Sequence, residues 1–148
     1  MYDFGLTNEQ KLLRQNVREF AENEIAPVAQ QLDETETFSL DLTRKMAGLG
    51  LFGIVVSEEY GGAHMDYLAY VIAVEEIARI DGSQAATVAA ANSLGIGPIY
   101  YFGNEKQKKE WLPGMVAGEV VTAIAMTEPG TGSDLQGMRT TAKKDGNH

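Results

Sequence analysis

Apolar residues recur at intervals of three or four between residues 7 and 116, and this spacing predicts a series of amphipathic helices. The first helix begins at Thr7, because the Gln10 amide three residues later completes the pattern of a capping box. Pro27 is expected to end or bend this helix. An outer face of Arg14, Arg18, Glu19 and Glu22, without chemical partners, is expected opposite an inner face of Leu13, Val17, Phe20, Ala21 and Ile25.

A group of glycines follows the second predicted helix, which Ser39 caps and a left-handed Gly48 ends. Gly48, Gly50 and Gly53 spell G-x-G-x-x-G, the glycine pattern of dinucleotide-binding units. In those units the pattern follows a strand and opens a helix, whereas here it follows a helix and leads into the apolar run 51–56. The order of elements therefore argues against a Rossmann-type site.

A third helix is predicted from its cap, Asp66, to about Asp81. Its apolar residues cover more than half of its circumference, which predicts burial on two sides. Glu75 and Glu76 are adjacent in this helix, and adjacent helical side chains diverge by roughly 100°. One of the two is therefore expected to face solvent or an arginine such as Arg79, and the pair is not interpreted as a general acid and base.

Two further helices differ in the size of their side chains. The helix predicted from Gln84 to about Leu94 is rich in alanine, so that a neighbouring helix can pack closely or a ligand can lie beside it. Asn104 caps the last helix, in which Trp111 and Leu112 are predicted to face inward. The lysines within residues 106–109 fit either a solvated face or a phosphate site.

The pattern changes after the last helix. Residues 120–125 are apolar and rich in β-branched side chains, and residues 137–144 alternate polar with small or apolar ones, so each predicts a strand. Asp-Gly at residues 145–146 is a hairpin-turn signal. Between the strands, residues 126–134 concentrate glycine, proline and hydroxyl side chains, which fits either a strand-end turn or a loop whose N–H groups and hydroxyls bind an anion or a planar cofactor.

Composition narrows the range of partners. The 148 residues carry 12 Lys and Arg against 21 Asp and Glu, and the net charge of −9 disfavours nucleic acid and anionic membranes. The absence of cysteine excludes disulfides and thiolate metal sites, and neither His64 nor His148 has a second ligand at metal spacing. No apolar run approaches the ~20 residues of a membrane span, and Met1 is not followed by a signal-peptide pattern. A cytoplasmic protein is expected.

Residues 125–134 read Ala-Met-Thr-Glu-Pro-Gly-Thr-Gly-Ser-Asp, which resembles the flavin-binding signature T-E-P-x-x-G-S-D of acyl-CoA dehydrogenases. Residues 103–108, which read G-x-E-x-Q-K, and the E-x-Y-G-G at residues 58–62 are similar to other passages of that family. The resemblance implies a mainly α fold. An N-terminal helical bundle, residues 1–121, would be followed by the opening strands of an incomplete β-domain, residues 122–148.

The resemblance also implies roles for single residues. In the family this loop lies against FAD, so Met126 and Thr127 would contact the flavin ring, while Gly132 and Ser133 would lie near the pyrophosphate. Ser133 would also reach the acyl-CoA, and Ala90 would border the acyl tail. Glu128 and Asp134 are expected to hold the shape of the loop, because anions do not suit direct contact with phosphate.

The activity implied is the FAD-dependent oxidation of an acyl-CoA thioester to the trans-2-enoyl-CoA, as in fatty-acid β-oxidation. The family abstracts the α-proton, passes the β-hydride to flavin N5, is reoxidised by an electron-transfer flavoprotein and is commonly a homotetramer. Its catalytic carboxylate lies in a C-terminal helical domain, so no catalytic residue and no metal ligand is assigned here. Because the turn at residues 145–146 lacks a return strand, we expect the N-terminal part of a longer enzyme, inactive alone. The alternative is a non-catalytic helical binding module.

Overall fold

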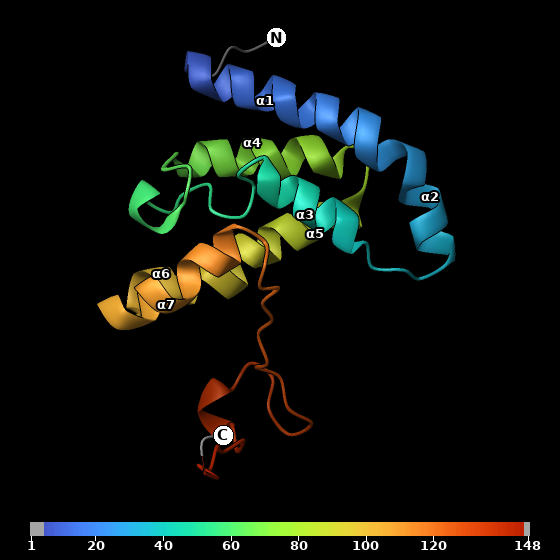
Figure 1. Cartoon of the computed structure of the whole chain (residues 1–148). Helices are drawn as coiled ribbons and strands as arrows, with labels where there is room; N and C mark the ends of the chain where they lie inside the picture. The colour runs from blue at the N-terminus through green and yellow to red at the C-terminus, as the bar shows by residue number, and fades with distance from the viewer. Residues whose placement is uncertain (1–4, 147–148) are drawn as a thin grey trace.

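The computed structural model describes residues 5–146, and these residues form a helical bundle followed by an extended segment (Figure 1). In chain order the α-helices are α1 Asn8–Phe20, α2 Ala26–Glu34, α3 Leu40–Gly48, α4 Tyr67–Ala78, α5 Gly82–Ala90, α6 Gly97–Phe102 and α7 Glu105–Val116. Side-chain caps on the N-terminal N–H groups fix the starts of α1, α3, α4, α5 and α7. Shorter helical turns are the π-helices Ala21–Ile25 and Ala91–Ile96 and the 3₁₀-helices Glu58–Tyr60 and Leu135–Gly137.

The helices pack in pairs, some consecutive in the chain and some not. α1 lies along α4, α4 packs against α5, and α6 and α7 run side by side at the far end of the bundle (Figure 1). Burial of apolar side chains between them provides the main stabilisation. The residues that are almost fully buried come from every layer and include Ile25, Met46, Leu51, Ile54, Ile77, Val88, Ile96 and Leu112.

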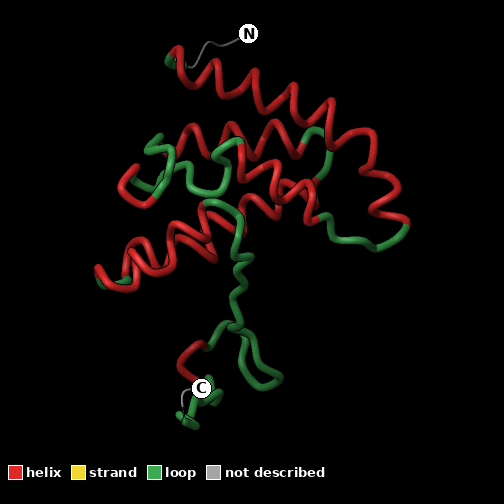
Figure 2. Tube along the Cα trace, in the orientation of Figure 1, coloured by secondary structure: helices red, strands yellow, loops and turns green. Residues whose placement is uncertain are grey.

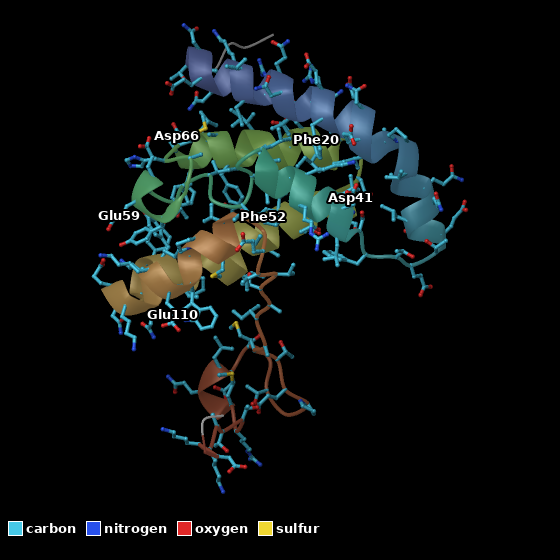
Figure 3. All side chains as sticks on the ribbon, in the orientation of Figure 1. Phe20, Asp41, Phe52, Glu59, Asp66 and Glu110 are labelled. Atoms are coloured by element: carbon cyan, nitrogen blue, oxygen red, sulfur yellow. The ribbon has the colours of Figure 1, made fainter. Side chains whose placement is uncertain are left out.

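The predicted caps are confirmed. Thr7 and Gln10 form the capping box of α1, and the Asp66 carboxylate caps α4 by accepting from the Ala69 N–H at 2.8 Å. Asp66 also accepts from the Gln10 side chain at 2.8 Å, so it joins the starts of α1 and α4, where Figure 3 shows it. These caps set the register in which α1 lies on α4.

Pro27 bends the first helix instead of ending it. The π-helix Ala21–Ile25 precedes α2, and the Ala26 N–H donates to the carbonyl of Ala21, one residue further back than in an α-helix. Pro27 lies in the first turn of α2, where its missing N–H costs little. The chain therefore turns between α1 and α2 without losing its helical path (Figure 1).

Three predictions about glycine and buried faces were wrong. Gly48 is the last residue of α3, and the left-handed residue is Gly50, with φ at +75°. The two-sided burial predicted for α4 fails because Leu68 and Val71 are exposed. Trp111 is 48% exposed, although Leu112 beside it is fully buried as expected. In both α4 and α7 the apolar face is wider than the surface that the neighbouring helices cover.

The prediction that no residue of the first helix has a partner was also wrong. Arg18 donates two hydrogen bonds to the Glu76 carboxylate, at 2.8 and 2.9 Å, and Arg79 donates a third at 2.9 Å. The Glu76 side chain is 3% exposed, whereas both arginines are about half exposed. Glu75 is exposed, so the expected divergence of the pair holds.

The predicted opening strands are not formed. Within residues 5–146 the β-structure is a single isolated bridge between Glu128 and Thr131, and Figure 2 shows loop over residues 120–125 and 138–144, while Gly137 ends a 3₁₀-helix. A strand is stable only when a neighbouring strand completes its hydrogen-bond ladder. Neither segment has such a ladder here, and the apolar pattern that predicts a strand does not supply one.

Candidate functional site

The glycine-rich loop, residues 126–134, closes on itself as a tight turn. The Glu128 and Thr131 backbones exchange two hydrogen bonds of 3.0 Å across Pro129 and Gly130. Pro129 fixes φ and lacks an N–H, which suits the second position of such a turn. The loop therefore holds a defined backbone, projecting from the bundle at the end of the extended segment in Figure 1.

Glu128 holds the loop to the segment that follows it, as predicted. Its carboxylate oxygens accept from the N–H groups of Arg139 at 2.9 Å and Thr140 at 2.8 Å. Hydrogen bonding by Thr140, and then by the Arg139 backbone, lowers the pKa of Glu128 below its usual range. The ionised carboxylate is thus part of the loop's structure and is not free to act on a ligand. The Asp134 carbonyl, rather than its side chain, accepts the Gly137 N–H at 3.1 Å.

The hydroxyls of the loop divide into two kinds. Thr131 is buried, and its hydroxyl donates to the Gly137 carbonyl at 3.1 Å, so it is used inside the loop. The hydroxyls of Thr127 and Ser133 make no hydrogen bond among residues 5–146, and both residues are exposed. Gly132 is exposed, with open space where a Cβ would stand. These three groups can donate to a phosphate or a planar ring.

Met126 adds an apolar surface to the same loop. It is 39% exposed, next to the free hydroxyl of Thr127. An apolar thioether beside hydrogen-bond donors suits a cofactor that has both a flat ring and phosphates. The free hydroxyls of Thr127 and Ser133, the open backbone at Gly132 and the thioether of Met126 therefore fit FAD.

Ala90 lies on a different surface, where it lines a pocket of about 180 Å³. The pocket is bounded by α3, α5, α7 and the start of the extended segment, and its walls are mostly apolar. Figure 3 shows Phe52 near the point where the extended segment leaves the bundle. The complete lining is Phe38, Thr43, Phe52, Thr87, Ala90, Ala91, Ile96, Met115, Val120, Val121 and Thr122.

Gly95 fixes where the extended segment crosses the bundle. A Cβ on Gly95 would overlap the Thr122 hydroxyl, so only glycine permits this approach. Thr122 also lines the pocket that contains Ala90, and it lies four residues before Met126. The structure thus links the alanine-lined helix to the chain that leads into the glycine-rich loop.

Several pocket residues were not identified from the sequence. Phe38, Thr43 and Met115 come from parts of the chain far from α5, and nothing in their local pattern indicates a shared pocket. Asn92, which lies outside this pocket, was named only as part of a motif, yet its amide donates to the carbonyls of Leu51 and Val88 and accepts from the Ile54 N–H. Such contacts across the sequence could not be found from periodicity.

No group of three or more His, Asp or Glu side chains within residues 5–146 could hold a metal ion. His64 carries a positive φ of 51° in an exposed loop, and His148 lies outside the described residues. In the described part of the chain, none of the helices is long and apolar enough to cross a membrane.

Comparison with known proteins identifies the fold. Residues 7–119 match the family described as acyl-CoA dehydrogenase, N-terminal domain. Butyryl-CoA dehydrogenase from Megasphaera elsdenii superposes with a TM-score of 0.88 at 35% identity, covering 94% of this chain and 37% of that one. A chain in the structure of the electron transferring flavoprotein of Acidaminococcus fermentans gives a TM-score of 0.91 at 39% identity, covering 98% and 38%.

A sequence relative agrees with these structures. The short-chain specific acyl-CoA dehydrogenase of Clostridium acetobutylicum is 44% identical over 146 residues, which is 99% of this chain. The fold and the family match together define an acyl-CoA dehydrogenase N-terminal domain. The chain belongs to the acyl-CoA dehydrogenase family. It spans 38% of the length of that relative.

Proposed function

We propose that this chain supplies the flavin-contacting loop and one wall of the acyl pocket of an FAD-dependent acyl-CoA dehydrogenase. The observation that carries the proposal is the loop at residues 126–134, whose Thr127 and Ser133 hydroxyls and Gly132 backbone are free for a ligand, while the Glu128 carboxylate and the Thr131 hydroxyl are used within the protein. When bound, FAD accepts the two electrons removed from the acyl chain.

The residues of this chain bind and orient the flavin and the acyl-CoA. Met126 and Thr127 lie against the flavin ring, Gly132 and Ser133 donate to the pyrophosphate, and Ser133 also reaches the acyl-CoA. Ala90 faces the acyl tail, because it lines an apolar pocket that would be filled by a larger side chain. No acidic residue of this chain is proposed as the base that takes the α-proton, and that group belongs to the C-terminal helical part of the family fold.

The same proposal extends to domains and partners. Residues 1–121 are the helical domain, and residues 122–148 open the β-domain, whose strands would form once partner strands are present. An electron-transfer flavoprotein is the proposed redox partner, and the complete enzyme is proposed to be a homotetramer. The structural likeness to a chain solved in work on an electron transferring flavoprotein supports the choice of redox partner.

The test is Ser133→Ala in the natural full-length protein. Loss of one hydrogen bond to a charged group should weaken FAD or acyl-CoA binding by about 1.5–3 kcal/mol, roughly 10-fold to 150-fold in Kd. Flavin content, FAD titration and bleaching of the flavin by an acyl-CoA measure the effect. Ser57→Ala, in a distant loop, is the control.

A wild-type protein that contains no flavin, or whose flavin no acyl-CoA reduces, would refute the proposed function. Unchanged affinities for both ligands in Ser133→Ala would refute only the role of that hydroxyl.

A further inference from the structure

Two pockets lie one after the other along α5. The pocket of about 180 Å³ that contains Ala90 faces Thr87 and Ala90 of this helix and Ala91 at the start of the following π-helix. A second pocket, of about 600 Å³, faces Ser83 and Gln84 one turn earlier. Residues spaced by three or four share one side of a helix, so the two pockets follow the same side of α5.

Phe38 is the side chain that lines both pockets. The apolar pocket begins near Gly95, which Thr122 of the extended segment covers, and continues past Ala90 to Thr87. From Gly95 to Gln84 the helical path covers roughly 17 Å at 1.5 Å per residue. Because Phe38 lines both pockets, it stands where the apolar pocket, with Thr87, meets the larger pocket, with Gln84.

The pockets differ in chemistry on the two sides of Phe38. The apolar pocket is lined mainly by alkyl and aromatic groups, whereas the larger one includes Asp33, Glu36, Ser83 and Gln84. An acyl tail gains free energy in the first and would lose it beside the carboxylates of the second. The phenyl ring thus marks a boundary in polarity as well as in space.

Hydrogen bonds hold the loop that carries Phe38. The Thr37 N–H donates to the Leu32 carbonyl at 3.0 Å, and the Thr35 hydroxyl donates to the Gln31 carbonyl at 2.7 Å. On the other side, the Ser39 hydroxyl accepts the Leu42 N–H at 3.2 Å and caps α3. Residues on both sides of Phe38 are therefore fixed to helices, which limits how far the ring can move.

We infer that Phe38 sets the length of acyl chain that the enzyme accepts, by closing the distal end of the acyl pocket and confining it to short chains. This inference rests on the proposed function. Removing the ring would lengthen the apolar pocket by the volume that the ring occupies and so admit additional methylenes. Each methylene that a pocket accepts or rejects changes kcat/KM about 10-fold or more.

The experiment compares butyryl-CoA with octanoyl-CoA in the natural flavin-loaded enzyme and its Phe38→Ala variant. The ratio of kcat/KM for octanoyl-CoA over butyryl-CoA should rise at least about 10-fold. Leu40→Ala is the matched control, since Leu40 is similarly exposed at 50% against 54% and lines neither pocket. Its ratio should equal that of the wild type.

The milder variant Phe38→Leu guards against misfolding and should shift the same ratio in the same direction by a smaller factor. An unchanged ratio in both Phe38 variants, with active wild type, would overturn the inference while leaving the proposed function intact. A wild-type enzyme that oxidises neither thioester would refute the proposed function, and the role of Phe38 with it.

Discussion

Glu76 shows how one residue can join two helices of this bundle. Its buried carboxylate accepts hydrogen bonds from Arg18 of α1 and from Arg79 just after α4. Burial alone would raise the pKa of Glu76, but the bonds from the two arginines outweigh it and the pKa lies below its usual range. If the negative charge of the carboxylate were removed, water could still solvate both arginines, because each is about half exposed. The loss of folding stability is therefore smaller than for a fully buried ion pair.

We therefore predict that Glu76→Gln lowers the free energy of unfolding by about 1–3 kcal/mol at pH 7. A carboxyl with a lowered folded-state pKa stabilises the protein above its unfolded-state pKa and loses that contribution as pH falls through the folded value. The difference from the wild type should shrink below about pH 4.5. Urea unfolding at pH 7 and below about pH 4.5 measures this difference in the free energy of unfolding. Glu75→Gln, at the exposed neighbouring position, should change little, and an equal loss in both variants would contradict the prediction.

At the scale of elements, the segment from α5 to α6 is one helical path with a π-helix in its middle. Ala91–Ile96 widens the helix where Asn92 turns inward to bond the loop at Leu51 and Ile54. The widening also brings Gly95 against the extended segment. One irregular turn thus positions the alanine-lined surface of α5 next to the chain that leads into the glycine-rich loop.

This placement predicts the effect of filling the pocket from α5. Ala90→Leu should lower kcat/KM for octanoyl-CoA more than for butyryl-CoA, because the added methyl groups occupy space that only the longer tail needs. We expect at least about a 10-fold difference between the two losses. Ala86→Leu, exposed on α5 and outside the pocket, is the control. Equal losses for both chain lengths would favour a packing role for Ala90.

The elements were predictable from the sequence where local chemistry decides them. Capping residues such as Thr7, Asp66 and Asn104 start their helices as expected, because a cap needs only a side chain and the next turn. Exposure was less predictable, as Trp111 and Val71 show, since it depends on which surfaces neighbouring helices cover. For the candidate site, the loop was recognisable as a motif, whereas the pocket around Ala90 depends on distant residues.

The molecule as a whole joins a packed bundle to a segment with few contacts. Residues 123–146 add Thr131 alone to the buried residues, and the glycine-rich loop keeps its shape through its own hydrogen bonds. A dinucleotide binds tightly only when a formed pocket encloses most of its surface. The bundle therefore has a hydrophobic core of its own, whereas the loop alone does not enclose a dinucleotide.

We predict that the 148-residue chain by itself folds as a helical bundle but retains no FAD after gel filtration. Without the family's catalytic carboxylate its turnover of acyl-CoA should fall by roughly 10²–10⁴-fold from this cause alone. Circular dichroism, the visible spectrum and an assay with an artificial electron acceptor measure the three properties. A yellow protein with stoichiometric flavin that oxidises acyl-CoA would contradict the prediction.

The position of Phe38 in the connection between α2 and α3 has a consequence for how substrate range can change in evolution. The ring is half exposed and absent from the hydrophobic core, so most substitutions there should leave folding intact. Related enzymes that diverge at this one position could acquire new chain-length preferences by single mutations. A pocket closed by a core residue would require several compensating changes for the same result.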